Sequence, residues 1–246
     1  MPELLFVEER RRAILEELRK NGRVNVRTLS ETMSVSTVTI RQDLRALEDG
    51  GLLERTYGGA VSRTSGTLLP ELSFHVRQNH HRREKAAIAA AAAQWIHDGD
   101  TIAIDPSTTA FALVPYLKRF VRLTVVTNSL IIAQSFLDSL SITVLMPGGR
   151  LRRDSVSLVG APDQLPSINL NRAFMSARGV TLAEGISDVD PDEVALKQAL
   201  VNRCASTVVM IDGSKWGQVA PYTFANVNQV ERIITSADAP QAVIDQ

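Results

Sequence analysis

The stretch VSTVTIRQDLRALEDGGLLERTYGGAV, residues 35–61, decides the fold of the amino-terminal part of the chain. Its first half predicts a helix over residues 37–49, because Ile40, Leu44 and Leu47 fall on one narrow stripe at about 100° per residue. That stripe must face a small core. After two glycines, the run LLERTYGGAV predicts a β-hairpin.

Two further helices are predicted before this one. Residues 8–20 form an amphipathic pattern that ends at an Asn-Gly pair. Asn25 is a plausible N-cap for a short second helix that carries Leu29 and Met33, and Ser36 is a plausible N-cap for the third. Two short helices joined by so brief a turn predict a helix-turn-helix, whose second helix lies in the DNA major groove.

The side of the third helix that faces away from the core has the chemistry of base readout. Gln can bond adenine through two contacts, and Arg can do the same to guanine or grip phosphate. Hydroxyls in the first turn and two residues of the hairpin can contact the DNA backbone. The alternative for each residue is an ordinary solvated surface. The candidate DNA-binding residues are Ser36, Thr37, Thr39, Arg41, Gln42, Arg45, Arg55 and Tyr57.

The totals restrict the class of protein without naming it. The chain has 246 residues and a formal net charge of zero, so any DNA affinity must come from locally placed Lys and Arg. Its single cysteine, Cys204, excludes an intramolecular disulfide and fits a reducing compartment. The N-terminus is not a secretory signal, and no apolar run approaches the roughly 20 residues that span a bilayer. We predict a soluble cytoplasmic protein with no cofactor and no metal site.

Two patterns of secondary structure indicate two domains. Residues 1–61 are dense in helix signals and predict a winged helix-turn-helix. Residues 62–84 are polar and without a steady period, which indicates a linker. From about residue 100, short β-branched runs alternate with amphipathic stretches, so residues 85–246 predict a larger α/β domain with a mainly parallel sheet.

Small polar residues follow the predicted strands of this second domain. In an open parallel sheet the strand ends share one edge, where ligands bind. Free amides and hydroxyls at a helix start suit an anion, although simple helix capping explains the hydroxyls as well, and a lysine on an amphipathic helix can be merely solvated. The candidate ligand-binding residues are Asp105, Ser107, Thr108, Thr109, Asn128, Ser129, Gly148, Gly149, Arg150, Glu193, Lys197, Asp212 and Lys215.

Residues 35–61 resemble the signature VSxxTIRRDLxxLExxGxLxRxHGGA of the DeoR family of bacterial transcriptional regulators. The blocks TIAIDPSTTA, LTVVTNSL, VLMPGGRL, SLVG, RAFMSARGV, DEVALKQAL, VVMIDGSKWG and VERIITS follow the family's sensor domain in order. The resemblance implies a winged helix-turn-helix that binds operator DNA. It also implies a sensor fold similar to ribose-5-phosphate isomerase and the CoA transferases, with a phosphorylated sugar or related metabolite as effector.

Four departures from the family pattern have expected consequences for binding. Gln42 stands where the family usually has Arg, which weakens one backbone contact and shifts base preference towards adenine. Ser107, Asn171 and Ser176 replace a glycine, an aspartate and a glycine, and we expect all three to cluster around the ligand crevice. Added side chains should narrow the pocket or change the effector.

Two functions are weighed. The first is a repressor of carbohydrate metabolism genes that binds double-stranded operator DNA as a dimer or tetramer and responds to a phosphorylated sugar. The alternative is a sugar-phosphate isomerase-like enzyme with a DNA-binding appendage. An isomerase needs an acid/base pair, and the carboxylates among the candidates, Asp105, Asp212 and Glu193, show no convincing paired spacing. We therefore predict a regulator and not an enzyme.

Overall fold

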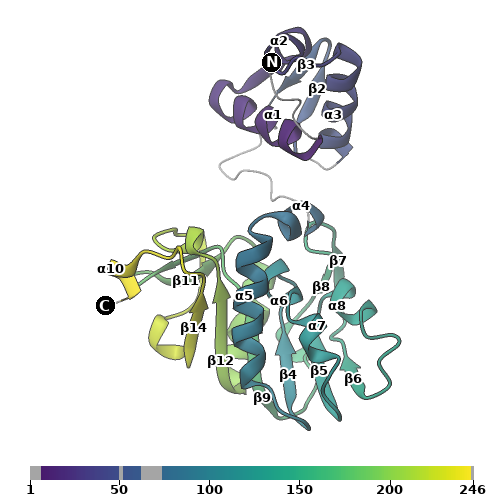
Figure 1. The fold of residues 1–246 in the computed structure, drawn as a ribbon. Helices are drawn as coiled ribbons and strands as arrows, with labels where there is room; N and C mark the ends of the chain where they lie inside the picture. Colours follow the sequence, from purple (N-terminus) through teal and green to yellow (C-terminus); the bar gives the residue numbers. More distant parts are fainter. Residues whose placement is uncertain (1–6, 50–51, 62–73, 245–246) are drawn as a thin grey trace. The chain divides into compact units, whose positions relative to one another are not determined.

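A computed structural model describes residues 7–49, 52–61 and 74–244 (Figure 1). The chain divides into two compact units, Met1–Ser73 and Phe74–Gln246. The predicted linker falls partly outside the described residues, and its second half is helical, with α4 (Phe74–Asn79) and the start of α5 (Arg82–Ala92). Helix α4 is too short to leave a period in the sequence.

The first unit is a winged helix-turn-helix, as predicted. It contains α1 (Val7–Asn21), β1 (Arg23–Asn25), α2 (Val26–Thr32), α3 (Thr37–Asp49), β2 (Glu54–Thr56) and β3 (Gly59–Val61). The strands form an antiparallel sheet in the order β1-β3-β2, so the predicted hairpin gains β1 as a third strand. Asn25 caps α2 by accepting hydrogen bonds from the backbone N–H groups of Arg27 and Thr28.

The wing is held tightly against the rest of this unit. Gly59 pairs with Asn25, and a Cβ at Gly59 would lie 2.0 Å from the carbonyl oxygen of Val24. Only glycine allows the two strands to approach so closely. The turn before it, at Gly58, has φ +95°. The wing therefore depends on glycine for both its packing and its turn.

The second unit is an α/β domain with a mainly parallel sheet, as predicted. Its central sheet has the order β14-β12-β9-β4-β5-β6, and every pairing in it is parallel. The strands are β4 (Thr101–Ile104), β5 (Leu123–Thr127), β6 (Ile142–Leu145), β9 (Leu170–Met175), β12 (Cys204–Ile211) and β14 (Arg232–Thr235).

Alternate residues of the central strands enter two separate cores, one on each face of the sheet. Ile102 and Ile104 pack with α5, α6 (Thr108–Phe111), α7 (Val114–Leu117) and α8 (Leu130–Gln134). Ala103 faces the opposite core, where α9 (Pro191–Arg203) packs. A sheet covered on both faces explains why its strands carry consecutive apolar residues, such as Ile102, Ala103 and Ile104 of β4.

Smaller elements surround the carboxyl ends of these strands. They are the hairpin β7 (Arg150–Arg152) and β8 (Ser157–Val159), the sheet β10 (Gly179–Thr181), β11 (Gly185–Asp188) and β13 (Tyr222–Ala225), and helix α10 (Gln241–Ile244). Single 3-10 turns occur at Ala93–Trp95, Pro162–Gln164, Gly213–Lys215 and Val227–Gln229. No helix within the described ranges is long and apolar enough to cross a membrane.

Candidate functional site

Helix α3 presents a basic and amide-bearing face to solvent. Ile40, Leu44 and Leu47 are buried in the core of the first unit, as their spacing predicts. Arg41, Gln42 and Arg45 are exposed. The face that the sequence assigns to base readout is therefore free to meet a ligand.

Asp43 lies on the same helix but is turned into the protein. Its carboxylate accepts hydrogen bonds from Nε of Arg10, at 2.5 Å, and Nε of Arg11, at 2.9 Å, both on α1. Sequence reasoning missed this cluster, although Asp43 stands three residues after Ile40, on the flank of the buried stripe. Because Asp43 is neutralised inside, the exposed side of α3 keeps a net positive charge.

The first turn of α3 and the wing contribute the other predicted DNA-binding residues. Ser36 accepts from the backbone N–H of Thr39 at 3.1 Å, and their hydroxyls are 2.8 Å apart. Thr37 is half-buried. Arg55 is exposed, and its guanidinium lies 3.6 Å from a carboxylate oxygen of Glu48. Tyr57 is fully exposed at the wing turn.

Lys197 is the centre of a buried charge cluster at the carboxyl edge of the sheet. Its ammonium lies 2.6 Å from Asp188 and 3.0 Å from Asp105, and it donates to the carbonyl oxygen of Ser176 at 2.7 Å. An ammonium has three N–H donors, and three acceptors surround this one. The sequence left Lys197 between a solvated side chain and a ligand contact. The structure buries it, so it is not solvated, and three internal acceptors already surround its ammonium.

The ammonium of Lys197 and the carboxylates around it stabilise each other's charged forms. Burial alone would lower the pKa of Lys197, but Asp188 and Asp105 raise it above its usual value. Burial alone would raise the pKa of Asp188, but the charge and hydrogen bond of Lys197 hold it below its usual value. Lys197 and Asp188 therefore both stay charged at neutral pH.

The segment after β4 is a capped turn. Ser107 is the N-cap of α6: its hydroxyl accepts from Ala110 N–H at 3.1 Å and donates to Asp105 at 2.5 Å. Its φ of −76° is ordinary, so this position does not need glycine. Thr108 and Thr109 are buried in the first turn of α6.

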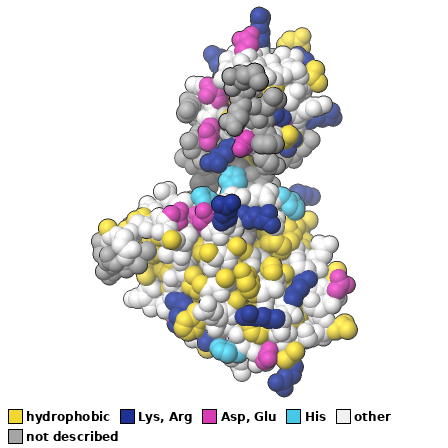
Figure 2. Space-filling model, viewed as in Figure 1, with side chains coloured by type: hydrophobic (Ala, Val, Ile, Leu, Met, Phe, Trp, Pro, Cys, Tyr) yellow, Lys and Arg dark blue, Asp and Glu magenta, His cyan; other side chains and the backbone are white. Residues whose placement is uncertain are grey.

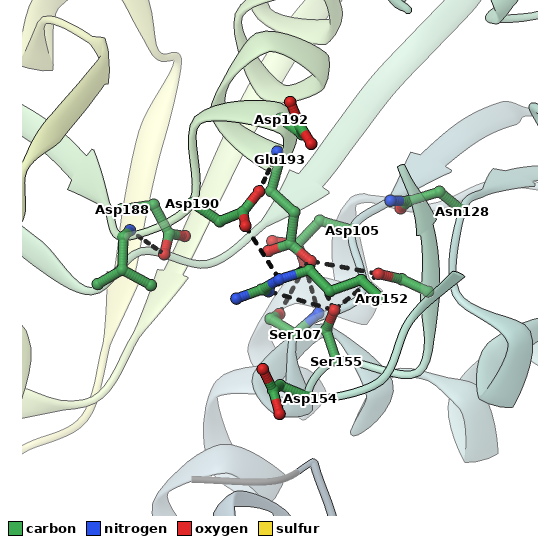
Figure 3. Close-up of polar contacts among 12 residues, drawn as sticks. Asp105, Ser107, Asn128, Arg152, Asp154, Ser155, Asp188, Asp190, Asp192 and Glu193 are labelled. Carbon is green, nitrogen blue, oxygen red and sulfur yellow. Dashed lines mark hydrogen bonds and ion pairs between the residues drawn. The ribbon is translucent and has the colours of Figure 1, made fainter. Parts of the chain in front are cut away.

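Arg152 joins the β7–β8 hairpin to the start of α9 (Figure 3). It lies 3.0 Å from Glu193 and 3.1 Å from Asp190, which caps α9. Glu193 also accepts from the hydroxyls of Ser155 and Ser157 at 2.7 and 3.2 Å. Burial raises the pKa of Glu193, although Arg152 and Lys197 oppose that shift. Glu193, one of the three carboxylates considered as the base of an isomerase, is therefore held in a packed network.

The loops after β5 and β6 both contact the β7–β8 hairpin. Asn128 donates its side-chain amide to the carbonyl oxygen of Leu158 at 3.0 Å, and Ser129 is the buried N-cap of α8. Gly148 and Gly149 are exposed, and a Cβ at Gly149, whose φ is +145°, would lie 2.4 Å from the carbonyl oxygen of Val159. The exposed Arg150 pairs with Asp192 at 2.8 Å.

A third group of charges follows β12. Asp212 accepts from the backbone and hydroxyl of Ser214, and these bonds, with the charge of Lys215, lower its pKa against the effect of burial. Asp212 also acts electrostatically on Lys85 of α5. Lys85 and Lys215 repel each other, and both are repelled by Arg77 and Arg178. We call Arg77, Lys85, Arg178 and Lys215 the basic cluster; three of its four members were not predicted.

The three departures from the family pattern do not cluster together, contrary to the prediction. Ser176 lies at the carboxyl edge, where its N–H donates to Asp105 at 2.9 Å. Asn171 lies near the start of β9, where its side chain accepts from the N–H of Thr101, the first residue of β4. Parallel strands begin at the edge opposite to the one where they end, so Asn171 is remote from the carboxyl-edge residues.

Comparison with known proteins matches both units. Residues 10–66 match the DeoR-like helix-turn-helix domain, and residues 80–237 match the DeoR C terminal sensor domain. The chain is 34% identical to the HTH-type transcriptional regulator GolR of Listeria innocua over 94% of this chain and 91% of that protein. It is 29% identical to the glycerol-3-phosphate regulon repressor of Escherichia coli over 96% of this chain and 93% of that protein.

Solved structures give a weaker similarity. A ribose 5-phosphate isomerase from Methanocaldococcus jannaschii aligns over 55% of this chain and 55% of its own, with 15% identity and a TM-score of 0.41.

Proposed function

From the premise that the chain belongs to the DeoR family of transcriptional regulators, we propose that it represses genes of carbohydrate metabolism and is controlled by a phosphorylated metabolite. The first unit binds double-stranded operator DNA, with α3 in the major groove and the wing against the backbone. One relative is named as the repressor of a glycerol-3-phosphate regulon, which supports both the sign of control and the chemistry of the signal.

The exposed face of α3 is the observation that carries the DNA-binding part of the proposal. Arg41, Gln42 and Arg45 project from a helix whose only acidic residue between them, Asp43, is neutralised by α1. Gln42 reads a base, whereas Arg41 grips phosphate. The hydroxyls of Ser36, Thr37 and Thr39, with Arg55 and Tyr57, position the unit on the backbone.

The carboxyl edge of the central sheet is where we place the effector. The segments after β4, β5, β6 and β12 all carry polar residues there, and such an edge is where open parallel sheets bind ligands. Ser107, Thr108 and Thr109 form one wall. The charge for the anion comes from Lys215 and its neighbours, because Lys197 already has three partners.

We also propose that the chain acts as a homo-oligomer. One winged helix offers little contact area, and paired half-sites on DNA require paired readers. Light scattering of the purified chain, alone and with operator DNA, tests this proposal, and a monomer in both conditions contradicts it.

A gel shift on the chain's own promoter, titrated with sugar phosphates, tests the function. We expect a shift at low salt that a phosphorylated compound reverses. No shift contradicts the DNA-binding part, and a shift that no phosphorylated compound alters contradicts the effector part.

Two variants of α3 sharpen the test. Arg41→Ala should weaken binding to operator and random DNA alike, whereas Gln42→Ala should lose roughly 1 to 3 kcal/mol of discrimination at one base pair. Arg12→Ala is the matched control, because Arg12 is exposed on α1 and pairs only weakly with Glu16. Equal losses on random and operator DNA for Gln42→Ala contradict its role as a base reader.

A further inference from the structure

Phe74 is the first residue of the second unit and of α4, and its side chain is completely buried. Its ring packs edge-on against the ring of Phe111, with 5.5 Å between the two centroids. Its backbone N–H donates to the carbonyl oxygen of Asp154 at 2.7 Å. The residue that directly follows the connection between the units therefore contacts two separate segments of the second unit.

Both of these segments border the place where we put the effector. Phe111 ends α6, the helix whose first turn forms one wall of the proposed site. Asp154 lies in the turn of the β7–β8 hairpin (Figure 3), next to Ser155, which donates to Glu193 at 2.7 Å. The same hairpin accepts a hydrogen bond from Asn128, in the loop after β5. A shift of α6 or of the hairpin therefore reaches Phe74 directly.

The other end of α4 is tied to the same edge of the sheet. The buried ammonium of Lys85, on α5, donates to the carbonyl oxygen of Arg77 at 2.5 Å. Lys85 also interacts electrostatically with Asp212, which follows β12. Both ends of α4 therefore depend on the arrangement of the residues at the proposed effector site.

Helix α4 has little else to hold it in place. It contains six residues, and so short a helix is not stable without tertiary contacts. Phe74 is the only apolar residue among its described side chains. Lys, Arg and His side chains gather over α4 and the start of α5 (Figure 2). The exposed ones on this segment are His75, His80, His81, Arg82 and Arg83.

Both points where α4 is attached have a residue in the left-handed backbone region. Val156, in the same turn as Asp154, has φ +51°, and His81, at the joint between α4 and α5, has φ +52°. This region is unfavourable for residues other than glycine, above all for a β-branched one. Strained backbone of this kind is typical of segments that switch between conformations.

The docking of α4 sets the length of the connection between the units. Residues 62–73 join the DNA-binding unit to α4, and undocking adds the six residues of α4 to this connection. An extended residue spans about 3.3–3.6 Å, so the gain in reach is up to roughly 20 Å. Half-sites on DNA are about 34–36 Å apart, so a difference of this size decides whether two readers can bind together.

We propose that Phe74 couples the effector site to DNA binding. The effector holds α6 and the β7–β8 hairpin in the arrangement that binds Phe74, so α4 stays docked and the connection stays short. Two readers on paired half-sites need the longer connection, so DNA binding undocks α4. Effector and operator DNA therefore oppose each other through one helix without sharing a contact. This inference rests on the proposed function, including the homo-oligomer.

Hydrogen exchange of the full chain tests the undocking without any effector. We expect the amides of residues 74–79 to exchange at least about tenfold faster when the chain is bound to its promoter DNA than when it is free. Residues 86–92 of α5 should exchange equally in both conditions and serve as the internal reference. Exchange of residues 74–79 that is unchanged or slower on DNA overturns the inference.

The variant Phe74→Ala tests the coupling, with glycerol 3-phosphate, glucose 6-phosphate and fructose 1-phosphate as probes. We expect at least one probe to weaken DNA binding by the wild type about tenfold or more in a gel shift. Phe74→Ala should bind DNA at least as tightly as the wild type does without a probe, and that probe should change its affinity less than about twofold. Leu140→Ala, the truncation of a fully exposed apolar residue, should respond as the wild type does.

Calorimetric titration with the same probe distinguishes lost coupling from a damaged second unit. Coupling is reciprocal, so Phe74→Ala should bind the probe as the DNA-bound wild type does, and DNA should no longer change that affinity. Weaker binding than this reports damage to the second unit, and the decision then falls to a variant that leaves Phe74 in place.

That variant carries the insertion GSGSGS after Ser65, which lengthens the connection by as many residues as α4 contains. Its affinity for the probe without DNA should stay within about twofold of the wild type, whereas the probe should no longer weaken DNA binding. Replacement of residues 64–69 by GSGSGS, which keeps the length, is the matched control and should respond as the wild type does.

The outcomes separate this inference from the proposed function. A wild-type chain that binds no DNA, or whose DNA binding no probe alters, contradicts the proposed function and the inference together. A wild type that responds, with an insertion variant that responds equally, leaves the proposed function standing and overturns the inference. An equal response from a Phe74→Ala variant that still binds the probe overturns it as well.

Discussion

Each unit buries a cluster of charges around one central residue, and the two central residues have opposite signs. In the first unit one carboxylate, Asp43, is held by two guanidinium groups. In the second unit one ammonium, Lys197, is held by two carboxylates. Both centres sit beside a proposed binding surface, and in both the central residue is absent from that surface.

The charge of a binding surface therefore depends on which charged side chains are already paired in the interior, because those side chains do not reach the surface. Helix α3 carries Arg41, Asp43 and Arg45, yet only the basic side chains remain outside. The carboxyl edge carries Lys197, yet the cations left for a ligand belong to the basic cluster. Counting charges along the sequence gives the wrong surface in both cases.

The largest effect should follow removal of the central ammonium. Lys197→Met leaves Asp105 and Asp188 buried without their counter-ion, so we expect the second unit to lose about 3 to 5 kcal/mol of unfolding free energy at pH 7. The loss should shrink at pH 5, because Asp188, whose pKa Lys197 holds down in the wild type, takes up a proton more readily once that ammonium is gone. Urea unfolding followed by tryptophan fluorescence measures it, since Trp95 and Trp216, the chain's two tryptophans, both lie in this unit. An unchanged midpoint contradicts the central role of Lys197.

Removal of the carboxylate of Asp43, the central residue of the first unit's cluster, should reduce the unfolding free energy by a smaller amount. Asp43→Asn removes the counter-charge of Arg10 and Arg11, but Arg11 is one-third exposed and can turn to water. We expect the first unit to lose about 2 to 3 kcal/mol, measured by thermal unfolding in far-UV circular dichroism. Glu16→Gln makes the same charge change at an exposed carboxylate and should have little effect. Equal losses of unfolding free energy in the two variants would show that the buried ion pairs of Asp43 do not stabilise the first unit.

A third change contrasts two buried lysines of the second unit. Partners raise the pKa of Lys197, whereas burial lowers that of Lys85 to about 8. Between pH 8 and 10.5 the unfolded state keeps a proton on Lys85 that the folded state has lost, so stability rises with pH in this range. Between pH 8 and 10.5 the unfolding free energy of the wild type should rise by on the order of 1 kcal/mol relative to that of Lys85→Met, a value reduced to allow for solvent screening. A constant difference between the two proteins, followed by urea unfolding, would contradict the shift.

The smallest effect should come from an exposed pair close to the buried ones. Arg150→Ala removes the ion pair between Arg150 and Asp192, whose side chains are 70% and 53% exposed, respectively. The variant should lose no more than about 0.5 kcal/mol of unfolding free energy. Arg152→Ala, two residues away, should cost several times more, because Arg152 is 11% exposed and faces two carboxylates. Comparable midpoints in urea for the two variants would remove the distinction between exposed and buried charge.

The sequence predicts the elements that have a strong local signal. The stripe of Ile40, Leu44 and Leu47 locates α3, and the caps Asn25 and Ser36 locate the starts of α2 and α3. Helix α4 escapes such reasoning, because its one decisive residue, Phe74, gives no period.

The charge clusters could not be predicted in the same way. Lys197 meets partners at positions 105 and 188, and no local spacing joins these three residues. The basic cluster combines Arg77 and Lys85, from a stretch interpreted as a linker and a helix start, with Arg178, which follows a strand. Only the order of strands in the sheet brings such residues together. Asp43 is the exception, because its helical position already placed it near the core.

The closure of each cluster within its own unit has an evolutionary consequence. The partners of Asp43 are residues 10 and 11, and those of Lys197 are residues 105, 176 and 188. Recombination at the junction between the units therefore strands neither buried charge. A gene fusion can give this DNA reader a new sensor, or this sensor a new reader, without repairing the interior of either. Regulons can change their signal and keep their promoters by exchanging one intact module.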